Sequence, residues 1–195
     1  MSPDLYFLTV NYYSTDLIRL MLASLAKSGD RDYQVVLVNN SPDDQALNDL
    51  AESGRVTVLT APKNLGFGGG CNLGLEWIAT RDPQALIWLF NPDATLAPGA
   101  IAYVRQCLHQ EPDIGILGTR IVDLDGRLWF SQGRFNTWTG SLKHRDDGVC
   151  TNWEPPQIAP SRWVSGCSMI LNPAALTTSP RFDEQYFLDY EDADI

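Results

Sequence analysis

Two groups of oxygen-bearing side chains are the first candidates for chemistry in this sequence. In the stretch LFNPDATL, Asn91 and Asp93 follow an apolar run. Residues two apart in an extended chain point to the same side, so their amide and carboxylate oxygens could both face a hard divalent cation or the diphosphate that it carries. The alternative is an ordinary Asx turn that closes a strand.

The second group is the acidic segment DYEDADI, whose carboxylates are Asp189, Glu191, Asp192 and Asp194. Crowded carboxylates raise one another's proton affinity, so one of them could act as a general base. The alternative is a solvated acidic helix start, which the helix dipole favours. A hydrolase triad does not fit, because WVSGCSMI has no G-x-S-x-G elbow and the chain has only two histidines.

A third feature is the glycine-rich stretch NLGFGGGCNLGLEW, which predicts backbone that bends tightly or approaches a ligand closely. It is not a dinucleotide fingerprint, because Leu73 occupies the third glycine position and the stretch follows the third strand. A phosphate loop of G-x-x-x-x-G-K-[ST] form is also absent. Two interpretations remain with equal weight: a turn that lies against a base or sugar phosphate before a helix near 72–79, and a left-handed turn with tight helix packing.

These groups are positioned by strands that alternate with helices. Apolar, β-rich runs predict strands at 5–10, 33–40, 55–61 and 85–90, and capped, periodic segments predict helices at 16–27, 41–53, 72–79 and within 91–110. This alternation implies an α/β protein with a mostly parallel sheet and helices on both faces. Asn91 and Asp93 then lie beyond the carboxyl end of a strand, where open α/β sheets bind ligands.

The pattern changes after residue 110. Short strands are predicted within 114–123 and 128–135, a long surface loop over 135–160, and a strand with a short helix within 162–176. We therefore expect a single domain over 1–195, with a β/α half at 1–110 and a mixed C-terminal half at 111–195.

Composition limits the classes of binding partner and the cellular compartment that are expected. The formal net charge of -10 disfavours broad contact with nucleic acid or with an anionic lipid surface. The start of the chain has no leader pattern, and no apolar run reaches about 18 residues, so a cytoplasmic protein is expected. The four cysteines form no C-x-x-C pair, which favours reduced thiols used in packing.

Six segments in order, LTVNYYSTDLIRLMLASL, VVLVNNSPDD, NLGFGGGCNLGL, LIWLFNPDATLAPGAI, WVSGCSMILNPAAL and FDEQYFLDYEDADI, resemble the family 2 glycosyltransferases and their rhamnosyltransferase-like branch. The resemblance implies the GT-A nucleotide-diphosphosugar transferase fold, with the β/α half binding the nucleotide and the C-terminal half on the acceptor side. It also implies inverting, metal-dependent sugar transfer. A nucleotidyltransferase is a weaker alternative, because it needs a glycine-rich, basic loop after the first strand and VNYYSTD is neither.

The same resemblance implies a role for individual residues. The nucleotide pocket would be lined by Val10, Asn11, Asn40, Ser41, Asn64, Gly66, Phe67, Gly70, Asn72 and Asn91. Asp93 would hold Mg²⁺ or Mn²⁺ against the diphosphate, in the N-P-D form of the family's D-x-D motif. Asn39 stands where the family often has an acidic residue, a departure from the family pattern at the position that bears on recognition of the ribose or base.

On the acceptor side, the resemblance makes Asp192 the base that deprotonates the acceptor hydroxyl, supported by Glu191, and places Trp163, Ser165 and Gly166 near the donor sugar and acceptor. In the family the E-D segment opens a helix and further chain follows it, whereas this sequence stops three residues later. We therefore expect a C-terminally incomplete chain that binds nucleotide but transfers sugar poorly. A catalytically silent module that binds nucleotide-sugar or glycan is the alternative.

The expected donor carries dTDP or UDP in preference to GDP, with rhamnose or another hexose as the sugar. The expected acceptor is a surface-polysaccharide or lipid-linked glycan. Family analogy therefore allows peripheral association with the inner face of the membrane, although no basic amphipathic helix supports it.

Overall fold

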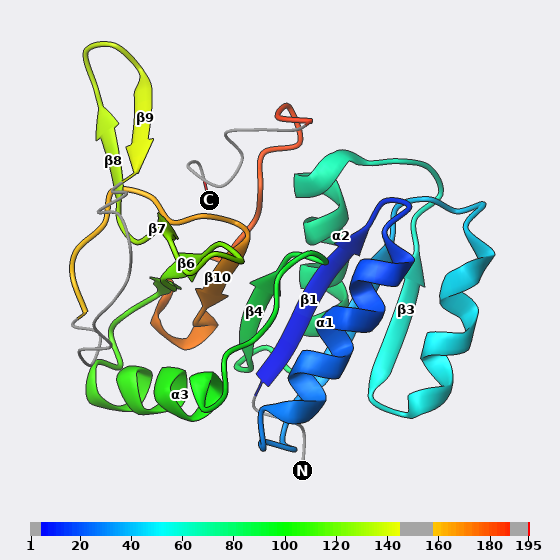
Figure 1. Ribbon diagram of the computed structural model, residues 1–195. Coiled ribbons are helices and arrows are strands. Elements are labelled where there is room, and N and C mark those ends of the chain that lie inside the picture. Colours follow the sequence, from blue (N-terminus) through cyan, green and yellow to red (C-terminus); the bar gives the residue numbers. More distant parts are fainter. Residues whose placement is uncertain (1–4, 145–157, 188–194) are drawn as a thin grey trace.

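The computed structural model describes residues 5–144, 158–187 and 195, and is built on one six-stranded sheet (Figure 1). The strand order is β3-β2-β1-β4-β10-β5, with bounds β1 (Leu5–Asn11), β2 (Gln34–Asn39), β3 (Val56–Thr60), β4 (Leu86–Phe90), β5 (Ile116–Gly118) and β10 (Ser168–Leu171). Strands β1 to β4 run parallel, and β10 is antiparallel to both β4 and β5. The predicted α/β class with a mostly parallel sheet is confirmed.

Helices cover both faces of this sheet, as predicted. One face carries α1 (Thr15–Lys27), the 3₁₀ helix η1 (Gln45–Ser53) and α3 (Ala100–Gln110), and the other carries α2 (Gly66–Ala79). On the first face the rings of Phe7 and Trp88 stack with centroids 5.1 Å apart. On the second face Leu75 and Ile78 of α2 belong to one buried cluster with Leu8. Every residue of β1 is buried, because the strand is covered on both sides.

Two of the predicted helices are wrong in their start or type. Helix α2 begins at Gly66, so the glycine-rich stretch forms its first turns and is not a loop that precedes a helix at 72–79. The segment predicted as a helix at 41–53 is a 3₁₀ helix from Gln45. The helix expected within 91–110 is confirmed, and it begins at Ala100, after the left-handed Gly99.

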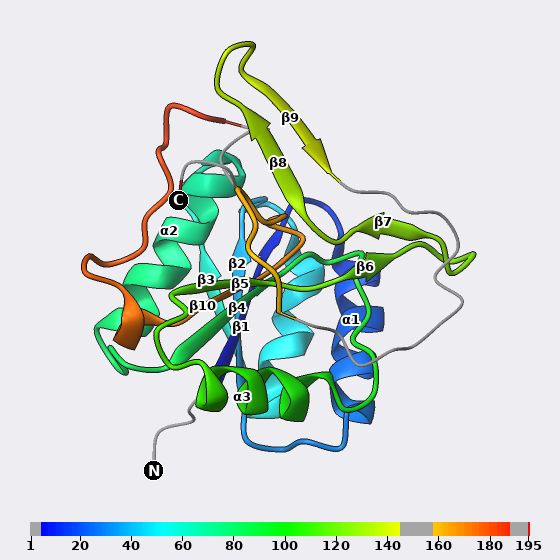
Figure 2. The ribbon, with the colours of Figure 1, turned by 90° about the vertical axis from the view of Figure 1, so that its left-hand side faces the viewer.

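The mixed half supplies β5 and β10 to the main sheet and forms two hairpins between them. These pair β6 (Ile121–Val122) with β7 (Leu128–Phe130), and β8 (Gly133–Asn136) with β9 (Ser141–His144). The predicted surface loop over 135–160 is therefore wrong over 135–144. The tight turn explains the difference: Gly140 has φ 68° and its N–H donates to the carbonyl of Asn136 (2.8 Å). The β8–β9 hairpin projects from the body of the molecule (Figure 2).

The predicted strand and short helix within 162–176 are confirmed by β10 and by the 3₁₀ helix η2 (Pro173–Ala175). Among the described residues, no helix combines the length and apolar character that a membrane crossing requires.

Candidate functional site

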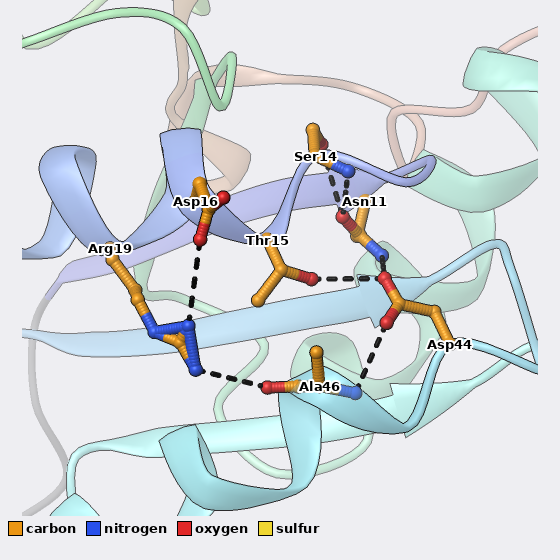
Figure 3. A network of polar contacts seen from close by, with 7 residues as sticks. All are labelled: Asn11, Ser14, Thr15, Asp16, Arg19, Asp44 and Ala46. Carbon is orange, nitrogen blue, oxygen red and sulfur yellow. Dashed lines mark hydrogen bonds and ion pairs between the residues drawn. The ribbon is translucent and has the colours of Figure 1, made fainter.

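The first part of the site is a buried polar network at the carboxyl ends of β1 and β2. The Asn11 amide donates to Asn39 Oδ1 (3.2 Å) and Asp44 Oδ2 (3.3 Å), and its Oδ1 accepts from the N–H (2.9 Å) and hydroxyl (3.0 Å) of Ser14. Asn11 is fully buried, and Figure 3 shows it between the start of α1 and the loop after β2. Its side chain therefore fixes these two loops to each other.

Asp44 is the charged member of this network. Its carboxylate accepts from the Thr15 hydroxyl (2.9 Å), from the N–H of Ala46 (3.1 Å) and from Asn11 (Figure 3). These bonds, led by that from Thr15, outweigh desolvation and lower the pKa of Asp44 below its usual range. The carboxylate also caps η1, because Ala46 is the second residue of that helix.

A second group of amides shapes the turn into α2. The Asn40 amide donates to Asn64 Oδ1 (3.0 Å) and to the carbonyl of Gly66 (2.9 Å), and its Oδ1 accepts from the N–H of Leu65 (3.0 Å). Ser41 is also buried, and its hydroxyl accepts from the N–H of Tyr13 (3.1 Å). These predicted nucleotide-pocket residues lie together, but in this structure their side chains hold the loops of the site.

The glycines of α2 allow close approach by the chain itself. Gly66 has φ 75°, and a Cβ there would collide with the carbonyl oxygen of Phe187. A Cβ on Gly70 would lie 2.8 Å from Val10 Cγ1, so the predicted pocket residue Val10 packs under the helix. Tight helix packing, one of the two interpretations of the glycine-rich stretch, therefore accounts for both positions.

Asn72 and Phe67 hold the C-terminal segment against α2. The Asn72 amide donates to the carbonyl of Phe182 (2.9 Å) and to Glu184 Oε1 (3.1 Å), and its Oδ1 accepts from the N–H of Phe182 (2.9 Å). The N–H of Phe67 donates to the carbonyl of Phe187 (3.2 Å). The segment 182–187 is thereby placed beside the start of α2, where the sequence predicted only a nucleotide.

The second part of the site lies at the carboxyl end of β4. The N–H of Asn91 donates to the carbonyl of Cys167 (3.0 Å), which joins this end of β4 to the segment before β10. Asp93 is exposed, and among the described residues none donates a hydrogen bond to its carboxylate. Burial, with a smaller contribution from the charge of Asp93, raises the pKa of the Cys167 thiol to about 11.

Ser165 and Gly166 lie in the same segment, and both are buried. The Ser165 hydroxyl accepts from the N–H of Cys167 (3.3 Å), so it shapes the turn into β10. Trp163 lies farther out: its indole N–H contacts the carbonyls of Arg134 (3.4 Å) and Lys143 (3.3 Å). The structure thus brings Ser165 and Gly166 to the end of β4 and ties Trp163 to the β8–β9 hairpin.

The two parts share one edge of the sheet, because β1 lies between β2 and β4 and the three strands are parallel. This edge carries the switch in chain direction at which open α/β sheets bind ligands. Asp192 and Glu191, predicted as the base and its supporting carboxylate, lie outside the described residues. In the part of the chain that is described, no three His, Cys, Asp or Glu side chains converge on a metal position.

One site feature was missed by the sequence analysis. Tyr12 and Tyr13 lie more than half exposed directly after β1, and Tyr13 has φ 50°. The Tyr13 hydroxyl donates to the Asp43 carboxylate (2.7 Å), so it links the loops after β1 and β2. The paired tyrosines next to Asn11 were the available signal.

Comparison with known sequences supplies the family. The profile described as Glycosyl transferase family 2 matches residues 7–165, which spans the network at β1, α2, β4 and the turn before β10. The chain belongs to this family. A curated relative, N-acetylglucosaminyl-diphospho-decaprenol L-rhamnosyltransferase of Mycobacterium tuberculosis, is 26% identical over 215 aligned residues, covering 100% of this chain and 70% of the relative.

Solved structures agree on the GT-A fold. S. aureus TarS has a TM-score of 0.69 at 17% identity, over 97% of this chain and 32% of TarS. GalNAc-T7, crystallised with UDP, GalNAc and Mn²⁺, has a TM-score of 0.67 at 14% identity, over 97% of this chain and 38% of that one. The chain thus spans about a third of the length of these two glycosyltransferase structures.

Proposed function

We propose that this family 2 glycosyltransferase inverts the anomeric centre as it moves a sugar, such as rhamnose, from a nucleotide diphosphosugar to a hydroxyl of a lipid-linked or surface glycan. The relative from M. tuberculosis supports this acceptor class, since its name specifies a decaprenyl-diphosphate-linked acceptor and rhamnose. The donor is a dTDP- or UDP-sugar, and UDP is the nucleotide in the GalNAc-T7 structure.

The observation that carries this proposal is the contrast between Asp93 and the amides around it. Asn11, Asn39 and Asn40 are buried and hydrogen-bonded within the protein. Asp93, at the same edge of the sheet, is exposed and has no hydrogen-bond donor among the described residues. A carboxylate that none of the described residues neutralises, at the ligand-binding edge of the sheet, is suited to a cation.

Mg²⁺ or Mn²⁺ fits the oxygen donors available there. Asp93 and Asn91 would supply a carboxylate and an amide oxygen, and hard cations bound by few protein groups take their other ligands from phosphates and water. When bound, the ion stabilises the charge that develops on the departing diphosphate. The position of Asn91 is fixed by its backbone bond to Cys167, which holds this donor next to Ser165 and Gly166.

We assign the base to Asp192, supported by Glu191. Asn72 and Phe67 hold residues 182–187, a few positions earlier in the chain, against the start of α2. A base must lie within hydrogen-bond reach of the acceptor hydroxyl, and that requires a fixed segment before it.

Calorimetric titration with UDP, dTDP and GDP, with Mn²⁺ and then with a chelator, tests the proposal. We expect Mn²⁺-dependent binding of UDP or dTDP, weakened at least tenfold by Asp93→Asn. Asp113→Asn removes another exposed carboxylate, before β5 at the opposite edge of the sheet, and should leave binding unchanged. Equal binding by the Asp93→Asn variant would refute the metal role. Binding without transfer to a glycan acceptor would favour the silent binding module.

A further inference from the structure

The β8–β9 hairpin differs in charge from the rest of the chain. The hairpin residues 133–144 contain Arg134 and Lys143 and no Asp or Glu, whereas the whole chain carries a formal net charge of -10. Trp138 lies in the turn at the tip of the hairpin, 96% exposed. Exposing an indole ring to water to this extent is unfavourable in free energy, and the ring forms no part of the core.

The strand pairing gives the hairpin two chemically distinct faces. Arg134 pairs with Lys143 across the strands, and the next pair, Phe135 with Leu142, points to the other face. Like charges directly opposite each other destabilise a hairpin. Within the described residues, no ion pair of Arg134 or Lys143 offsets this repulsion. Phe135 is 46% exposed. Basic and apolar groups are therefore both presented outward around the tip.

The base of the hairpin is fixed to the candidate site. The Trp163 indole contacts the backbone carbonyls of Arg134 and Lys143, and its ring packs against Phe130 with centroids 5.0 Å apart. Figures 1 and 2 both show the hairpin rising from the end of the molecule where β1 and β4 finish. The tip therefore points away from the body on the side of the sheet that carries the site.

We propose that this hairpin docks the protein on an anionic lipid bilayer. Tryptophan is enriched at the membrane–water interface, where its apolar ring and polar N–H are both accommodated. Lysine and arginine beside it are attracted to anionic headgroups over about one Debye length. The acidic remainder of the chain favours an orientation in which the hairpin alone meets the surface.

The inference rests on the proposed function in one respect, the lipid-linked acceptor. An acceptor anchored in a bilayer must reach the site from the membrane surface, and the hairpin would hold the site edge toward that surface. This local basic surface also refines the expectation from net charge, because -10 disfavours broad contact with anionic lipid but not contact through one projecting element.

Vesicle co-sedimentation tests the proposal directly. The protein is pelleted with vesicles of equal parts phosphatidylcholine and phosphatidylglycerol, and with vesicles of phosphatidylcholine alone, at low and high salt. We expect preferential binding to the anionic vesicles that weakens at high salt. Trp138→Ser should weaken it about tenfold, and Arg134→Gln with Lys143→Gln about 25-fold, at about fivefold for each charge.

A matched control keeps the overall charge change the same. Lys27→Gln with Arg31→Gln also removes two exposed positive charges, but at the end of α1 and the loop after it, far from the hairpin. This pair should bind anionic vesicles within about twofold of the unmodified protein, because its charges do not face the surface. Circular dichroism and thermal melting confirm that all variants remain folded.

Three results would overturn the proposal: no binding to anionic vesicles at low salt, equal losses for the two double variants, or unchanged binding by Trp138→Ser. Titration of the same variants with UDP and dTDP separates this inference from the proposed function. Nucleotide binding without vesicle binding would refute the docking surface but not the proposed function. Vesicle binding without nucleotide binding would refute the proposed function but not the docking surface.

Discussion

Asn72 and Phe182, 110 residues apart in the sequence, are joined by two hydrogen bonds between one carboxamide and one residue's backbone. Asn72 Nδ2 donates to the carbonyl (2.9 Å) and Asn72 Oδ1 accepts from the N–H (2.9 Å). This is the pairing that a neighbouring strand would provide. A single buried side chain in α2 thus takes the place of a strand for the segment that leads toward the proposed base.

We predict that Asn72→Ala destabilises the protein by about 2 kcal/mol, because it leaves the buried N–H and carbonyl of Phe182 without partners. Urea denaturation measures the change. Gln185→Ala removes an exposed side-chain amide whose hydrogen bond among the described residues is to Asp183 (3.4 Å), and should change stability by less than about 0.5 kcal/mol. Equal effects of the two substitutions would show that the Phe182 contacts contribute nothing.

Gly66→Ala should be far more costly than Gly99→Ala. Both glycines have left-handed backbone, with φ 75° and 77°, but a Cβ at Gly99 meets nothing within 4 Å and one at Gly66 meets the carbonyl of Phe187. We expect losses of about 1 kcal/mol at Gly99 and about 3 kcal/mol at Gly66 in thermal unfolding. Similar losses would mean that segment 182–187 moves away without cost.

Stability should fall at acidic pH through Asp44. Its folded-state pKa lies below the unfolded value of about 3.9, so its stabilising effect is complete above that pH and is lost as the pH falls through the folded-state value. Asp44→Asn should therefore flatten the dependence of the melting temperature on pH below about 4. The Asp113→Asn variant should keep the steeper dependence of the unmodified protein.

The Cys167 thiol should be unreactive at mild pH. With a pKa of about 11, its thiolate fraction at pH 8 is about 100-fold smaller than that of a thiol with the ordinary value of 9.0. Iodoacetamide labelling in chelator, followed by peptide mass spectrometry, should show slow modification of Cys167 that accelerates up to about pH 11. Asp93→Asn should speed the labelling modestly, because burial is the larger cause of the shift.

The layers of the fold could be predicted from the sequence, since strands covered on both faces are continuously apolar. Val36 and Trp88, each central in its strand, show this. The start of α2 could not be predicted, because glycine has a low helix propensity, and the close packing of Gly70 against Val10 depends on how distant segments fold together. The β8–β9 hairpin was also hidden, because its four-residue strands are too short for a clear alternation.

The candidate site was predicted as a set of positions rather than a set of contacts. The motifs correctly placed Asn11 and Asn91 at the ends of strands. They could not show that Asn11 bonds to Asp44, or that Asn72 bonds to Phe182, because such partners depend on how distant segments fold together. Tyr13 was missed for the same reason, since its contact with Asp43 forms between two loops.

Thr119 and Ser168 lie at the two ends of the segment between β5 and β10, which carries both hairpins. Their hydroxyls lie 2.7 Å apart, the N–H of Thr119 donates to the carbonyl of Ser168 (3.3 Å), and Ser168 also accepts from the indole of Trp88 (2.9 Å). These bonds hold the two ends of the intervening segment together. Doubling the length of such a loop costs only about 0.6 kcal/mol in closure free energy. The sheet can therefore be retained while evolution lengthens or exchanges the intervening chain, which makes the two hairpins the part of the fold most free to vary.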